Sequence, residues 1–149
     1  MKKIFIIVAS IILISTNISF AYAPSSSTDE FVSELEMIQN DLMMATKSLM
    51  CIENKSKEEM DIIKQSLAND SSKINYSFAA INRLYKNNSD TQLRKEISAI
   101  SEGLSSYSLA TNSLLLYIDN PNDTNQLFEA VGAIQNGRLT LEYLKSLKK

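Results

Sequence analysis

The chain has 149 residues, 15 basic and 17 acidic, with no histidine and a single cysteine. Without histidine it lacks the usual general base near neutral pH and the commonest zinc and haem ligand. One cysteine excludes an internal disulfide, and the lack of a basic stripe argues against a nucleic-acid partner. Only three glycines and two prolines are present, which argues against a turn-rich β-sandwich.

The first 23 residues have the three parts of a secretory signal peptide. Lys2 and Lys3 precede the apolar run Ile4–Ile14, and the small-x-small sequence "AYA" occupies positions 21–23. We expect cleavage after Ala23, which leaves residues 24–149 in the periplasm or outside the cell, with 13 basic and 17 acidic residues and a net charge of −4. The alternative is an uncleaved segment that anchors the protein to a membrane, although its many polar residues make it a poor transmembrane helix.

From residue 28 onwards, apolar residues recur at alternating spacings of three and four, which is typical of helices packed side by side. The spacing predicts four helices, over about residues 28–53, 57–86, 90–118 and 124–147. Their apolar positions are Phe31, Leu35, Ile38, Leu42, Ala45, Leu49 and Ile52; Met60, Ile63, Leu67, Ile74, Phe78, Ile81 and Tyr85; Leu93, Ile97, Ile100, Leu104, Tyr107, Thr111, Leu114 and Ile118; and Leu127, Ala130, Ile134, Gly137, Leu141 and Leu144.

Each predicted helix is preceded by a capping residue with Glu or Gln three positions later, a pattern that satisfies unpaired backbone N–H groups. The four pairs are Ser27/Glu30, Ser56/Glu59, Ser89/Gln92 and Asp123/Gln126. The breaks between the helices are short, and short connections make neighbouring helices antiparallel. The sequence therefore predicts an all-α, up-down-up-down antiparallel four-helix bundle.

Two positions leave the continuity of the helices open. The second helix contains a polar interruption around Asp70, and Gly137 follows an asparagine in the fourth, where a helix often ends. We expect both helices to continue with a kink. Because Gly137 falls on the apolar stripe, it would also allow a neighbouring helix to come close.

The acidic residues do not predict a catalytic or metal site. No Asp or Glu lies on the four stripes, so we expect an apolar core, unlike that of di-iron bundles. The acidic clusters Glu34/Glu36 and Glu58/Glu59/Asp61 lie near helix starts, where negative charge meets the positive end of the helix dipole. We therefore expect a protein without catalytic residues, cofactor or resident metal.

Sulfur is concentrated in the segment from Met37 to Cys51, which contains four of the six methionines and the only cysteine. At about 100° per residue, Met37, Met44 and Cys51 fall near 200–240° from the apolar stripe. Met43 and Met50 fall on the opposite shoulder, near 100–120°. We expect Met37 and Met44 to be half exposed and Cys51 to point outward, with Met43 and Met50 covered by a neighbouring helix.

Three interpretations of the sulfur cluster remain open: flexible filling between helices, a contact surface, or a Cu(I) site. Our leading hypothesis is a non-catalytic module that binds another macromolecule through Met37, Met44 and Cys51. Cys51 would also allow a disulfide-linked homodimer. The alternative is Cu(I) handling through the same three residues, although a spacing of about 10 Å per seven residues prevents them from sharing one ion within a single helix.

Overall fold

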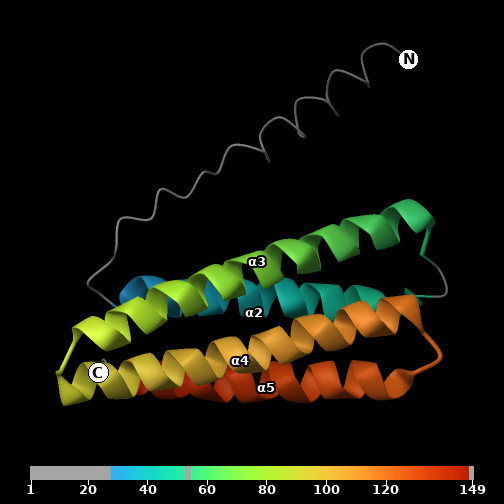
Figure 1. The fold of residues 1–149 in the computed structure, drawn as a ribbon. Coiled ribbons are helices and arrows are strands. Elements are labelled where there is room, and N and C mark those ends of the chain that lie inside the picture. The colour runs from blue at the N-terminus through green and yellow to red at the C-terminus, as the bar shows by residue number, and fades with distance from the viewer. Residues whose placement is uncertain (1–27, 53–54, 148–149) are drawn as a thin grey trace, which may run out of the picture.

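The computed structural model describes residues 28–52 and 55–147, which form four long helices: α2 (Asp29–Leu49), α3 (Lys57–Asn87), α4 (Thr91–Asp119) and α5 (Thr124–Ser146). Figure 1 shows the four helices packed against one another, and no strand occurs in the described ranges. The α4–α5 connection lies at the same end of the bundle as the end of α2 and the start of α3, whereas the α3–α4 connection lies at the other end. The all-α four-helix prediction is confirmed. The expected signal peptide and the cap at Ser27 lie outside the described residues.

Helix α3 begins with the predicted capping box. The hydroxyl of Ser56 accepts a hydrogen bond from the Glu59 backbone N–H at 3.2 Å, and the Ser56 N–H donates to the Glu59 carboxylate at 2.8 Å. This exchange satisfies backbone donors that have no partner within the helix. Of the four predicted caps, this one is confirmed in full.

The other described caps differ from the prediction. Asp90, not Ser89, caps α4, and its carboxylate accepts a hydrogen bond from the Leu93 N–H at 2.7 Å. At α5, the Asp123 side chain makes no capping bond. Thr28 precedes α2, and its hydroxyl donates a hydrogen bond to the Glu96 carboxylate of α4 at 2.6 Å. The sequence pattern thus predicted the helix starts to within one or two residues, but it did not predict which side chains cap them.

Helix α4 is the centre of the core. It packs most extensively against α5 and also contacts α3 and α2, while α2 packs against α5 as well. The predicted stripe on α4 is buried from Ile97 to Ile118, and four side chains of the α2 stripe, Leu35, Ile38, Leu42 and Leu49, are fully buried against it and its neighbours. Because burial of apolar surface is the main favourable term in folding, α4 contributes most to the stability of the bundle.

Helix α5 is continuous through Gly137, and the absence of a side chain there has a packing reason. The buried ring of Tyr107 on α4 lies against Gly137, and a Cβ atom built on this glycine would overlap the ring. The Tyr107 hydroxyl reaches across to the Gln39 side-chain oxygen of α2 at 3.0 Å. Gly137 therefore allows the close approach that the sequence suggested, and it does not end the helix.

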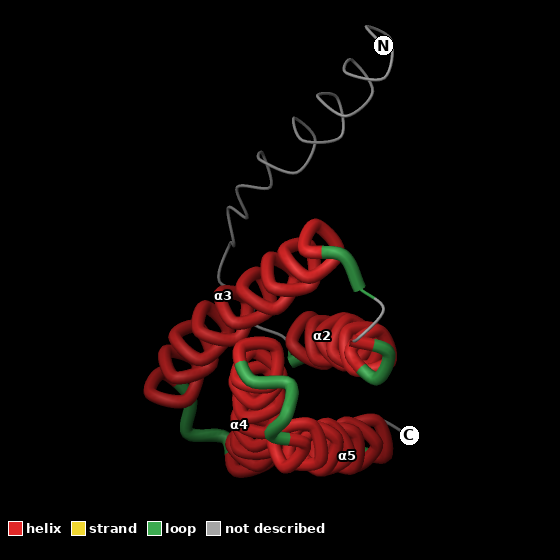
Figure 2. The backbone as a smooth tube through the Cα atoms, turned by 90° about the vertical axis from the view of Figure 1, so that its right-hand side faces the viewer, coloured by secondary structure: helices red, strands yellow, loops and turns green. Residues whose placement is uncertain are grey.

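Helix α3 is also continuous through Asp70, but it is the least buried of the four. In Figure 2 it runs obliquely to α4 and α5. Its buried residues are Leu67, Asp70, Ile74, Ser77 and Ile81, and none is buried between residues 57 and 66. The expectation of a wholly apolar core is therefore wrong, because two of these five positions are polar.

Candidate functional site

Helix α2 exposes the sulfur atoms that the sequence singled out. Met37 and Met44 are exposed, Met44 to 70%, and Cys51 is an exposed free thiol in the turn that follows the helix. These positions agree with the expected outward direction of this flank. The prediction that Met43 and Met50 are covered is wrong, because both are also exposed.

The first flank of α2 faces α3. Met44 lies in a shallow groove of about 180 Å³ that Ile62 and Ile63 of α3 also line, together with polar residues of both helices. Ile62 is 64% exposed, so its apolar surface adds to that of Met44. Ile62 was not among the predicted site residues because it lies beside the α3 stripe, next to Ile63.

The three sulfur residues do not converge on one point. Met37 and Met44 are two turns apart on one helix, about 10 Å along its axis at 1.5 Å per residue, and Cys51 follows the helix end. In the described part of the chain, no group of three or more His, Cys, Asp or Glu side chains is placed to hold a metal ion. The arrangement is therefore an extended strip, which we call the sulfur face: Met37, Met44 and Cys51.

Beside this flank, α2 and α3 also make polar contacts. The Ser77 hydroxyl donates to the Glu34 carboxylate at 2.6 Å. The Lys73 ammonium lies between Asp70, at 3.0 Å, and Asp41, at 3.3 Å. We call these five residues the α2–α3 polar seam, which joins the two helices by charge-assisted hydrogen bonds.

Asp70 is the most unusual residue of the polar seam. Its side chain is 1% exposed, one carboxylate oxygen contacts Lys73, and the other has no hydrogen-bond partner among the described residues. Burial raises the pKa of Asp70, and burial likewise raises the pKa of Glu34. Both carboxyl groups therefore take up a proton at a higher pH than usual, because burial disfavours their charged forms.

The second flank of α2 faces α5 and carries a separate groove of about 350 Å³. Its lining residues are Met43, Thr46, Lys47 and Met50 from α2, and Val131, Ile134, Gln135 and Arg138 from α5. Met43 and Met50 thus border a gap between the helices. This groove was not predictable, because the spacing of residues on one helix does not locate the neighbouring helix.

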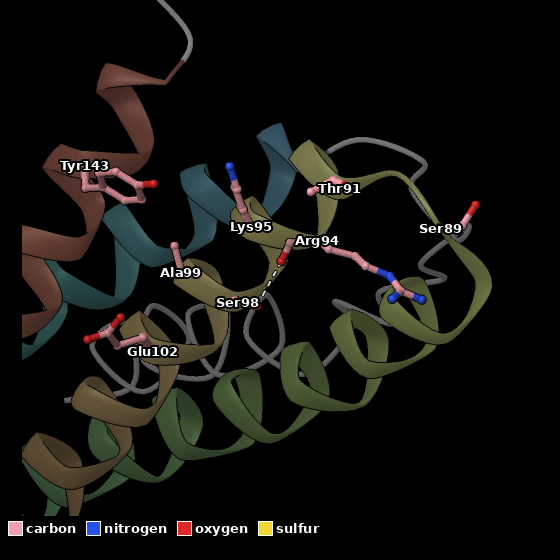
Figure 3. A pocket seen from close by; sticks show the side chains of 8 residues that line it. All are labelled: Ser89, Thr91, Arg94, Lys95, Ser98, Ala99, Glu102 and Tyr143. Atoms are coloured by element: carbon pink, nitrogen blue, oxygen red, sulfur yellow. Dashed lines mark hydrogen bonds between the residues drawn. The ribbon is translucent and has the colours of Figure 1, made fainter.

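A third hollow, of about 520 Å³, lies at the start of α4 (Figure 3). The side chain of Arg94 is directed towards the α3–α4 connection, where its Nε donates to the Asn88 carbonyl at 2.8 Å and its guanidinium lies 4.8 Å from the centre of the Tyr85 ring. Lys95 and Glu102 point in other directions in the same view. The charged side chains do not converge on a common point, so this hollow is a weaker candidate than the two flanks of α2.

None of the described helices has the length and apolar character needed to cross a membrane. No protein-family model, curated protein or solved structure matches the chain. The candidate surfaces are therefore defined by the geometry of α2 and its two neighbours.

Proposed function

We propose that this protein is a small exported, non-catalytic binding module that contacts another macromolecule through the sulfur face. The observation that supports the proposal is the exposure of Met44 beside Ile62, which gives two neighbouring helices an apolar surface in contact with solvent. Exposed apolar patches of this kind mark interaction sites, and methionine adapts to partners of irregular shape. A protein partner fits this surface better than a nucleic acid, because the chain has a net negative charge.

The proposal includes export and chain topology. The charged start, apolar run and "AYA" sequence support cleavage after Ala23 and a location in the periplasm or outside the cell. The short connections at alternate ends of the bundle support an up-down-up-down order of helices (Figure 1).

A homodimer linked through Cys51 is the simplest assembly that this surface allows. The thiol is exposed and the chain has no second cysteine, so in an oxidising compartment it pairs between chains or with a small thiol. We expect native protein to react with a maleimide within minutes and to show disulfide-linked dimer on non-reducing gels. A thiol that reacts only after denaturation would contradict the exposure on which the proposal rests.

Cross-linking from Cys51 tests the partner directly. A maleimide photo-cross-linker on Cys51 of the cell-envelope protein should give an adduct of defined mass. Met44→Glu should remove this adduct, because a carboxylate on the sulfur face opposes apolar contact. Leu116→Glu provides the control, since Leu116 is an exposed apolar residue on α4 and its replacement should leave the adduct intact. An adduct that survives Met44→Glu would argue against the sulfur face.

The alternative function is Cu(I) handling through Met37, Met44 and Cys51. Thioether and thiolate are the soft ligands that Cu(I) selects, and all three residues are exposed. Because the residues do not converge, an ion would need ligands from another helix or from a second chain. Anaerobic Cu(I) titration separates the two functions: stoichiometric uptake that Cys51→Ser abolishes would favour copper, and the absence of uptake would favour the binding module.

A further inference from the structure

The groove between α2 and α5 is independent of the sulfur face, because it lies on the opposite flank of α2. Its apolar lining comes from Met43 and Met50 on α2 and from Val131 and Ile134 on α5. Met43, Met50 and Val131 are all exposed, so their apolar surface is available to a partner. Phe128, which is 72% exposed, precedes Val131 by one helical turn and extends the apolar surface along α5.

The charges on this groove have one sign. Lys47 and Arg138 are the charged side chains that line it, and both are basic in a chain whose net charge is negative. Arg138 makes an exposed contact of 3.6 Å with Glu142 one turn further along α5. None of the ion pairs among the described residues includes Lys47. A partner with acidic residues at the edges of its contact surface would therefore complement this groove.

We propose that the α2–α5 groove binds an amphipathic, acidic helix of a partner protein. A groove between two packed helices accepts the ridge of a third helix, whose apolar residues would contact Met43, Met50 and Val131. Its acidic residues would lie next to Lys47 and Arg138. A flat membrane surface fits the same chemistry less well, because the apolar residues line a concave groove.

Two synthetic peptides test this proposal with the purified mature chain. The first is an 18-residue helix with leucine at i, i+3, i+4 and i+7 spacing and glutamate beside the apolar face, and the second carries lysine in place of each glutamate. With fluorescence anisotropy, we expect the glutamate peptide to bind about tenfold more tightly than its lysine twin, since Lys47 and Arg138 would each attract the first peptide and repel the second by a few-fold in affinity.

Variants locate the binding site. Val131→Asp places a carboxylate in the groove and should weaken binding of the glutamate peptide by about tenfold or more, as expected for a central apolar contact. Lys47→Gln should weaken it by about two- to fivefold, the range for an exposed charge pair. Ile62→Asp is the matched control, because it makes the same change at an exposed apolar residue of the other flank and should leave binding unchanged.

Circular dichroism of each variant distinguishes a loss of binding from a loss of folding. If Val131→Asp unfolds the bundle, Met50→Gln provides a milder change in the same groove. The proposal is overturned by equal affinity for the two peptides, by unchanged binding in Val131→Asp or Met50→Gln, or by failure of the glutamate peptide to bind. Binding to anionic-lipid vesicles without binding to the peptide would also overturn it, in favour of a membrane surface.

Discussion

The α4–α5 and α2–α3 pairs are both helical hairpins, but the contacts within them differ in extent and in kind. The α4–α5 contact is the most extensive in the bundle, and Gly137 allows the two helices to approach closely around Tyr107. The α2–α3 contact is the least extensive of the main helix pairs, and the polar seam runs through it. The extensive α4–α5 contact thus includes close apolar packing, whereas the smaller α2–α3 contact includes hydrogen bonds and ion pairs.

This difference concerns stability and function together. Burial of apolar surface contributes about 25 cal/mol per Å², whereas a hydrogen bond adds only about 0.5–1.5 kcal/mol net, because it replaces a bond to water. We therefore expect α3 to be held less firmly than α5. The sulfur face lies beside this weaker contact, where small movements of α3 would change the groove that contains Met44 and Ile62.

The largest expected effect comes from shortening a buried leucine in the α4–α5 pair. Leu104→Ala in α4 should lower the free energy of unfolding by about 2–5 kcal/mol, because a cavity replaces well-packed surface. Leu67→Ala in α3 makes the same change at an equally buried position, but we expect a cost at the lower end of this range, because its looser surroundings can collapse into the cavity. Urea unfolding measures both. A larger cost for Leu67→Ala would contradict the comparison.

Gly137→Ala should destabilise the protein by about 1–3 kcal/mol, the usual cost of overpacking, since the new methyl group would overlap the Tyr107 ring. Alanine favours a helix over glycine by about 1 kcal/mol, so a net loss would show that packing decides. Gly132→Ala is the control on the same helix: a Cβ atom there meets nothing within 4 Å, and stability should rise by up to about 1 kcal/mol. If both variants were stabilising, the close contact would not exist.

A smaller effect is expected from the pH dependence of the polar seam. Burial raises the pKa of Asp70 and of Glu34, so the folded state holds these protons more tightly than the unfolded state. Their contribution to stability therefore increases as the pH falls from 7 towards the ordinary carboxyl range at about pH 4, and it is lost again as the pH rises. Lys73 contacts Asp70 and also Asp41, whose negative charge further raises the pKa of Asp70, and Ser77 contacts Glu34.

Asp70→Asn removes one of these two contributions. When the pH is lowered from 7 to 5, the variant should therefore gain less stability, or lose more, than the unmodified protein. Glu142→Gln, at an exposed carboxylate of α5, serves as the control and should leave this difference unchanged. Denaturant unfolding at both pH values measures the effect. Equal responses of Asp70→Asn and Glu142→Gln to pH would contradict this role of Asp70.

The four helices were predictable because apolar spacing persists over many turns, most clearly in α4. The burial of Asp70 and Ser77 was missed because the stripe was defined by apolar residues alone. Positions 67, 70, 74, 77 and 81 follow the alternating three- and four-residue spacing without a gap, and geometry buries whichever residues occupy them. Likewise, Ser89 and Asp90 both suit a helix start, and only the backbone of the α3–α4 connection decides between them.

Only part of the candidate site could be predicted. The outward direction of Met37, Met44 and Cys51 follows from the helical turn, because they lie opposite a strongly apolar stripe. The exposure of Met43 and Met50 depends on where α5 lies beside α2, which the angles on α2 do not specify. Ile62 could not be linked to Met44 for the same reason, since their contact depends on the inclination of α3.

Hydrogen exchange followed by mass spectrometry tests most directly whether the bundle has a firmly and a weakly held half. Slow exchange requires buried, well-packed helices, and rapid exchange marks segments that open locally. We predict the slowest exchange in α4 between Ile97 and Ile118 and the fastest helical exchange in residues 57–66 of α3, where no side chain is buried. Equal protection of these two segments, or greater protection of the α3 segment, would contradict this prediction.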